Sequence, residues 1–159
     1  MRDMLFVSLI LLVASSASAD PKKESGPEKA ARAWQAAVRA STPTPPPTKD
    51  KPLDFTLTNV ATKSCKGMKK GHITDAPKVA KLHRCLVDTW KANAAEPTFR
   101  DWTTEDLPAA QKKAFDALGK DATLVLAEFM GDGEKLDLLI AMSADATVRA
   151  IWLEQSAFE

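Results

Sequence analysis

The fold is decided by residues 123–154, which read TLVLAEFMGDGEKLDLLIAMSADATVRAIWLE. Apolar and β-branched runs separated by turn residues are typical of neighbouring β-strands. The strand segments that we expect are Thr123 to Met130, Leu136 to Met142 and Thr147 to Glu154. Between the first two, Asp132-Gly133 favours a tight hairpin, because both residues tolerate a positive φ. The pattern predicts a three-strand antiparallel meander.

The turns also predict which residues face one another. A two-residue loop in the first turn places Phe129 opposite Leu136. A two-residue loop at Ala144-Asp145 in the second turn places Leu136 opposite Leu153. Because side chains alternate between the two faces of a sheet, these pairs form one continuous apolar core face.

The other face carries the best candidate site. The same registers place Glu128 opposite Asp137, and Asp137 opposite Trp152. Two opposed carboxylates repel one another unless a cation, a proton or a basic side chain lies between them. This row is therefore our ligand-binding hypothesis. The alternative is a solvated rim neutralised by Arg149 or Lys135.

Most of the remaining residues on that second face are apolar as well. They are Leu124, Leu126, Leu139, Ala141, Val148 and Ala150. One face of the sheet can be covered by helices, which leaves the other to form a pocket, a groove or a homodimer contact.

His83 is the fourth candidate for a ligand-binding residue. It falls near the middle of the apolar stripe of a helix expected from Thr74 to Ala92. A perturbed imidazole there can serve as a general base. The alternative is a histidine in the core or at its rim, because no nucleophile motif accompanies it.

The upstream sequence predicts further helices and strands. We expect helices at about Pro27 to Ala40 and from Thr103 to Gly119, strands at Leu53 to Thr58 and Phe99 to Trp102, a basic loop from Lys63 to Gly71, and a stiff proline-rich linker at 41–48. The predicted fold is therefore α+β, with a mainly antiparallel sheet that ends in the meander and with the helices packed on one face.

The start of the chain resembles an export leader. An apolar stretch of eleven residues, Met4 to Ala14, precedes Ala17-Ser18-Ala19, which has the A-x-A pattern of a signal peptidase site. The stretch is too short to span a membrane. We expect residues 1–19 to be removed, 20–52 to form the N-terminal helix and linker, and 53–159 to form a single domain. The alternative is a retained N-terminal helix.

Export to the periplasm or the extracellular space changes how the two cysteines are interpreted. In an oxidising compartment Cys65 and Cys85 predict a disulfide. A metal site with His72 and His83 has suitable ligand types, but its spacing lacks the short knuckles of zinc sites. We therefore expect no metal.

Charge and motifs exclude several function classes. The formal net charge is +1, which does not favour a nucleic-acid or membrane-surface partner. The charge is unevenly spread, since Lys49 to Lys91 is basic and Ala92 to Glu159 is acidic. We expect the two halves to dock on one another, with an anion-binding patch as the alternative. Nucleotide-binding, serine hydrolase and zinc protease motifs are absent, so we expect no cofactor.

Two function classes remain. The first is an exported, non-enzymatic module that binds an unknown protein or small ligand. The second is a small periplasmic hydrolase or isomerase with a pocket on the second sheet face. The first is favoured, because an enzyme of this size usually shows a sharper cluster of reactive side chains.

Overall fold

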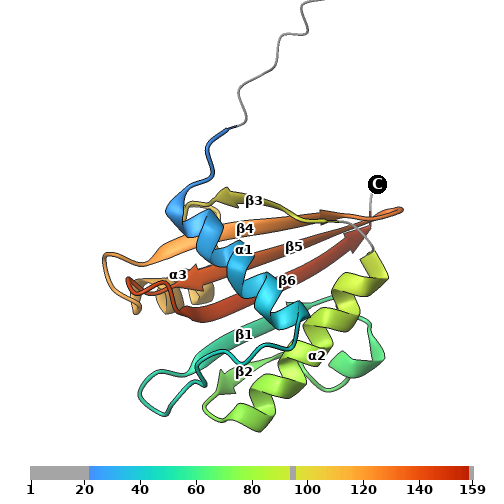
Figure 1. The fold of residues 1–159 in the computed structure, drawn as a ribbon, viewed down its shortest axis with the longest axis horizontal. Helices are drawn as coiled ribbons and strands as arrows, with labels where there is room; N and C mark the ends of the chain where they lie inside the picture. Colours follow the sequence, from blue (N-terminus) through green and yellow to red (C-terminus); the bar gives the residue numbers. More distant parts are fainter. Residues whose placement is uncertain (1–21, 94–95, 158–159) are drawn as a thin grey trace, which may run out of the picture.

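The computed structural model describes residues 22–93 and 96–157, so the predicted leader lies outside the described residues. The helices are α1 (Gly26–Arg39), α2 (Ala76–Asn93) and α3 (Ala109–Asp116), with a short 3-10 turn η1 (Lys63–Cys65). The strands are β1 (Leu53–Thr58), β2 (Lys70–Ile73), β3 (Thr98–Asp101), β4 (Thr123–Met130), β5 (Glu134–Met142) and β6 (Val148–Ala157). None of the described helices is both long and apolar enough to cross a bilayer. The predicted α+β class is confirmed (Figure 1).

The six strands form one mixed sheet in the order β2-β1-β6-β5-β4-β3. The prediction of a mainly antiparallel sheet ending in a meander is only partly right, because β1 pairs with β6 in parallel. That pairing joins distant parts of the chain, which local patterns cannot reveal. Strand β2 lies partly in the predicted basic loop. Its sequence, Lys-Gly-His-Ile, lacks the apolar alternation that signals a strand.

The first predicted register is correct and the second is wrong. Phe129 pairs with Leu136 as expected. Leu153, however, pairs with Leu138 rather than with Leu136. The second turn is longer than two residues, because the Ser143 amide bonds to the Thr147 carbonyl, and the register shifts again at the end of β5. Since the error is an even number of residues from Ala150 onward, those side chains of β6 keep their predicted faces. Val148 lies beyond the register shift and packs against the larger core, so its predicted place on the second face is wrong.

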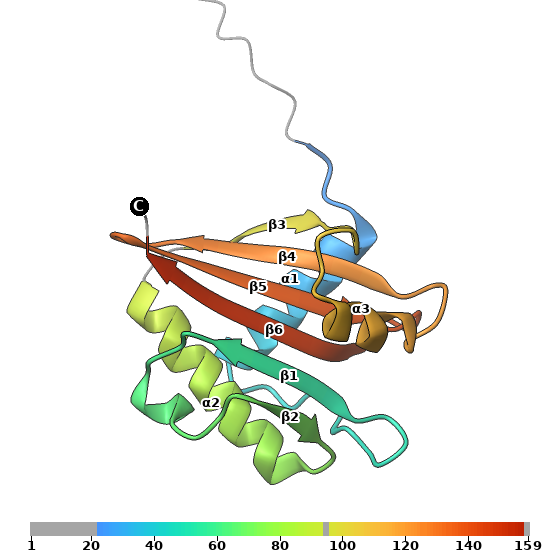
Figure 2. The ribbon, with the colours of Figure 1, turned by 180° about the vertical axis from the view of Figure 1, so that it is seen from behind.

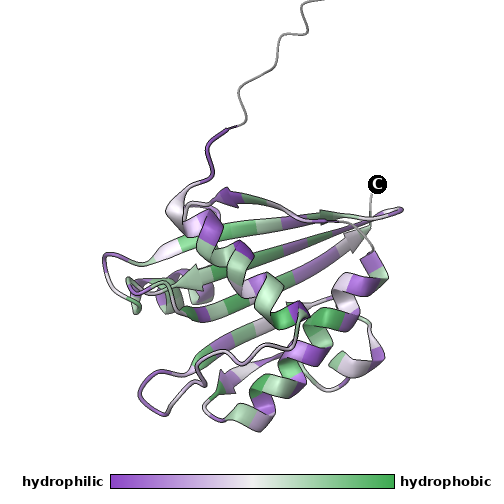
Figure 3. Ribbon diagram, viewed as in Figure 1, coloured by the Kyte–Doolittle hydropathy of each residue, from purple (hydrophilic) through white to green (hydrophobic). Residues whose placement is uncertain are grey.

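Helices cover both faces of the sheet, so the prediction that they share one face is wrong. Figure 1 shows α1 and α2 lying across one face, and Figure 2 shows α3 over one end of the opposite face. The apolar residues of β4, β5 and β6 divide between two buried clusters, one on each side of the sheet. Figure 3 shows that hydrophobic residues predominate along these strands. Helix α3 is shorter than predicted because Pro108 disfavours helical backbone at Leu107 and so delays its start.

The larger core joins α1 and α2 to the sheet. Ala31 and Val38 of α1 belong to the same buried cluster as Phe129 of β4 and Trp90 of α2. Trp90 stacks on Phe129, with ring centroids 6.0 Å apart. The N-terminal helix is thus part of the body of the fold.

A capping box at the start of α1 also anchors this helix to the sheet edge. The Ser25 hydroxyl accepts a hydrogen bond from the Glu28 amide, and Glu28 Oε2 accepts one from the Ser25 amide. The other oxygen of Glu28 accepts a bond from the backbone amide of Asp101 in β3, 3.1 Å away. Glu28 is only 4% exposed, and the amides of Ser25 and Asp101 satisfy its two carboxylate oxygens.

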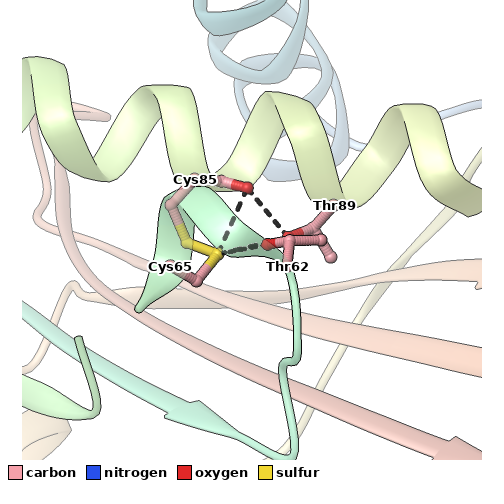
Figure 4. The surroundings of a disulfide bond; sticks show 4 residues. All are labelled: Thr62, Cys65, Cys85 and Thr89. Carbon is pink, nitrogen blue, oxygen red and sulfur yellow. Dashed lines mark hydrogen bonds between the residues drawn. A yellow bond between two sulfur atoms is a disulfide. The ribbon is translucent and has the colours of Figure 1, made fainter. Parts of the chain in front are cut away.

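The predicted disulfide is confirmed. Cys65 in η1 is bonded to Cys85 in α2, with the Cα atoms 4.8 Å apart. Both cysteines are buried. Thr62 and Thr89 flank the bond, and the Thr89 hydroxyl donates to the Cys85 carbonyl at 2.8 Å (Figure 4). The bond fixes the segment between β1 and β2 against α2.

Candidate ligand groove on the second sheet face

The second face is the side of the sheet that is turned away from α1 and α2. Cross-strand pairing places His72, Asp54 and Ala150 in one row across β2, β1 and β6. The next row contains Lys70, Thr56 and Trp152, and continues into Leu139 of β5. Polar side chains at one edge therefore give way to apolar ones at the centre.

The acidic pair predicted on this face is present and is neutralised. Glu128 lies opposite Asp137 in the sheet. The Lys135 ammonium lies 2.6 Å from a Glu128 oxygen and 3.2 Å from an Asp137 oxygen. Hydrogen bonding to Glu128, followed by that to Asp137, raises the pKa of Lys135. This arrangement is the one described by the solvated-rim alternative.

Trp152 lies beside this pair but not in its row. In the observed register Trp152 lies opposite Leu139, while Glu154 lies opposite Asp137. Trp152 is 5% exposed and packs in the smaller core cluster with Leu107, just before α3. Its predicted contact with the acids is therefore wrong, although the residue does lie on the predicted face.

His83 is separated from the other candidates by the sheet. It lies on α2, which covers the first face, and its ring meets Trp34 edge-on at 6.3 Å. Burial lowers the pKa of His83. A hollow of about 470 Å³ lies beside it, lined also by Ser41–Thr44. The structure therefore does not bring His83 together with Glu128, Asp137 and Trp152.

A groove runs between α3 and the second face. Its larger part has a volume of about 1190 Å³ and its smaller part, toward Asp137, has about 450 Å³. The two parts share Thr56, Gln111 and Trp152, so they adjoin one another. The groove takes its floor from β1 and β6 and one wall from α3.

A carboxylate and an imidazole meet in the larger part of the groove. Asp54 Oδ1 lies 2.5 Å from His72 Nδ1. Burial raises the pKa of Asp54, and the nearby His72 opposes this shift. Sequence reasoning missed the pair because His72 was considered only as a metal ligand. The alternation in β1 does place Asp54 on the second face, but nothing local indicates that β2 pairs with it.

The turn between β5 and β6 closes one end of the groove. The Asp145 carboxylate accepts hydrogen bonds from the Ser143 hydroxyl and the Thr147 amide, and these bonds lower the pKa of Asp145 to about 2. Arg149 donates to the Lys51 carbonyl at 3.2 Å. The guanidinium therefore links this turn to the segment that precedes β1.

Across residues 22–93 and 96–157, no cluster of three or more histidine, cysteine or acidic side chains is suited to holding a metal ion. The candidate site is thus a groove with an apolar centre, one Asp–His pair and several basic side chains. Comparison of the chain with protein-family models, curated proteins and solved structures found no match.

Proposed function

We propose that the protein is a binding module whose ligand occupies the groove between α3 and the second face. The observation that carries this proposal is that two hollows adjoin at Trp152, where they share three lining residues. Concave sites with an apolar centre and a few polar groups are the usual form of small-ligand sites.

An unsatisfied acceptor supports the same proposal. Asp137 Oδ1 is buried and has no hydrogen-bond partner among the described residues, whereas its other oxygen is held by Lys135. Asp137 also lines the smaller part of the groove. Buried polar atoms are normally paired, so a donor from a ligand or a water molecule is expected there.

The neutral fluorescent dye N-phenyl-1-naphthylamine tests the groove. Ala110 is an exposed α3 residue that lines it, and Ala33 is an exposed α1 residue remote from it. We expect Ala110→Trp to fill the groove and abolish saturable dye binding, while the matched variant Ala33→Trp binds like the wild type. Equal binding by both variants would contradict the proposal.

The Asp54–His72 pair favours a second candidate function, a small hydrolase. A carboxylate at Nδ1 orients an imidazole so that Nε2 can accept a proton from water. The hydroxide formed would attack an ester carbonyl, the bond to the alkoxy oxygen would break, and the imidazolium would return its proton to the departing alkoxide. The test is hydrolysis of p-nitrophenyl butyrate by His72→Gln, with His83→Gln as the matched control. Loss of a protein-dependent rate in the first variant alone supports catalysis, and equal rates in the two variants reject it.

We further propose that the protein acts outside the cytosol. The buried Cys65–Cys85 bond is of a kind that persists mainly in oxidising compartments. The predicted leader and its cleavage after Ala19 give the route. Intact mass of the protein from its native host tests both points, because a product beginning at Asp20 with no alkylatable thiol supports export. A product beginning at Met1 with two free thiols would contradict it.

A further inference from the structure

We infer that the ligand of the groove is a small anionic amphiphile, whose charged head lies among Lys51, Lys70, Lys113 and Arg149 and whose apolar body lies along Trp152. This inference rests on the proposed binding function and adds a ligand class to it. It is carried by the distribution of charge around the groove.

Four cationic side chains from four parts of the chain line the larger part of the groove. Lys51 precedes β1, Lys70 lies in β2, Lys113 in α3 and Arg149 at the start of β6. Among the described residues, no carboxylate lies within 4.0 Å of the charged nitrogens of any of the four. In the part of the chain that the structure describes, no ion pair joins the basic segment 49–91 to the acidic half, and Lys70 is therefore available for an anion.

The acidic side chains in the same part of the groove are mostly engaged. Asp54 is paired with His72, and Asp145 is held by Ser143 and Thr147 in its own turn. Asp50 lies on the exposed rim. Hydrogen bonding leaves Asp145 charged, so the larger part carries four basic side chains against three carboxylates. Its formal charge is +1 with His72 neutral, and a concave wall focuses such a field.

The body of the ligand has an apolar surface to lie on. Ala114 and Leu118 face the groove from α3 and the turn after it, and Ala150 and Trp152 face it from β6. Burying a hydrocarbon chain against such a surface removes apolar area from water and so favours binding.

The smaller part of the groove has the opposite charge. Asp106, Asp137 and Glu154 line it, against Arg100 and Lys135. An anionic head would be repelled there. This polarity favours one orientation, with the head at the Lys70 end and the chain directed toward Trp152.

Isothermal titration calorimetry with three probes of equal chain length tests the inference. The probes are decanoate, 1-decanol and decyltrimethylammonium, each below its solubility or micelle limit. We expect decanoate to bind most tightly. The double variant Lys70→Gln/Lys113→Gln should weaken decanoate binding about tenfold at low ionic strength, and added salt should reduce the difference.

A matched double variant controls for charge alone. Lys29→Gln/Lys81→Gln removes two exposed lysines that do not line the groove, and it should leave decanoate affinity unchanged. If decanoate and decanol bind with equal affinity and both lose binding in Ala110→Trp, the ligand is not specifically anionic, but the proposal of a binding groove stands. Tighter binding of the ammonium probe, or no binding of any probe, would also overturn the class. Decanoate binding that survives Ala110→Trp would overturn both proposals.

Discussion

At the scale of single residues, Lys135 decides whether the acidic row on the second face is stable. It is the closest cation to both Glu128 and Asp137. Without it the two carboxylates face one another across β4 and β5. An opposed pair of like charges is destabilising, which makes the lysine a structural requirement of this row.

Replacing Lys135 with methionine should lower the free energy of unfolding by about 1 kcal/mol at pH 7. Because the pKa of Lys135 is raised above 10.5, the stabilisation is fully present below that pH and is lost as the pH rises through the folded-state pKa. Urea denaturation at several pH values measures it. Lys120→Met, at an exposed loop position, is the matched control. Equal stability of the two variants at pH 7 would show that Lys135 does not stabilise the row.

Ser143 sets the acidity of Asp145 in the turn beside the groove. Removing the hydroxyl in Ser143→Ala should raise the pKa of Asp145 from about 2 toward its ordinary value of 3.8. A lowered carboxyl pKa stabilises the fold above pH 3.8, and this contribution is lost as the pH falls through about 2. The variant should therefore have a smaller contribution from Asp145 above pH 3.8. Carboxyl ¹³C NMR titration measures the pKa directly, and an unchanged value would contradict the hydrogen bond.

At the scale of secondary-structure elements, α3 is the weakest part of the fold. It has eight residues, none of them buried, and no side chain caps its N-terminus. By contrast, α2 has eighteen residues, and seven of them are buried. Short helices depend on tertiary packing for their stability, so the wall of the groove should open most readily.

Native-state hydrogen exchange tests this difference. We expect the amides of α3 to exchange through local opening at a lower free energy than those of α2, which should approach the global free energy of unfolding. Decanoate should slow exchange in α3 if the groove is its site. Protection of α3 equal to that of α2 in the free protein would show that the groove wall is as rigid as the core.

The predictability of the elements follows from how local their signals are. The first hairpin was predictable because Asp132-Gly133 specifies it, and the structure uses a positive φ at Gly133. The second register was not, because the Asp145 side chain and the bulge near Met142 lengthen the turn in a way that alternation does not record. The face of Trp152 was still predicted correctly, since an even shift preserves faces.

At the scale of the whole molecule, the pairing of strands from distant segments could not be predicted from the sequence. Parallel pairing of β1 with β6 creates the row of Asp54 and Ala150, and the pairing of β2 with β1 adds His72. The groove depends on these contacts and on α3 crossing the sheet. The disulfide was predictable, because the prediction required only that the chain has two cysteines and reaches an oxidising compartment.

Removing the disulfide by Cys65→Ala/Cys85→Ala should lower the free energy of unfolding by about 3 kcal/mol, as expected for closure of a loop of this length. The fold should survive, because Cys65 and Cys85 are only two of the many buried residues of the larger core. Guanidinium denaturation with and without a reducing agent measures the loss. The wild type should respond to reduction and the variant should not. A wild type whose stability is unaffected by complete reduction would contradict the predicted contribution.

The arrangement of the whole chain removes the reason for expecting a homodimer. It assumed a free apolar second face, but Leu124, Ala141 and Ala150 pack against the segment around α3 within one chain. Among the described residues, Met130 is the large hydrophobic side chain that remains exposed, and it lies at the end of β4.

The central claim is that the groove on the second face is where the protein binds its ligand. Its most direct test is a ¹H–¹⁵N correlation spectrum recorded during titration with decanoate. We expect saturable shifts at Lys70, His72, Ala150 and the indole of Trp152, with little change in α2. Shifts gathered instead around His83, or no saturable shifts at all, would contradict it.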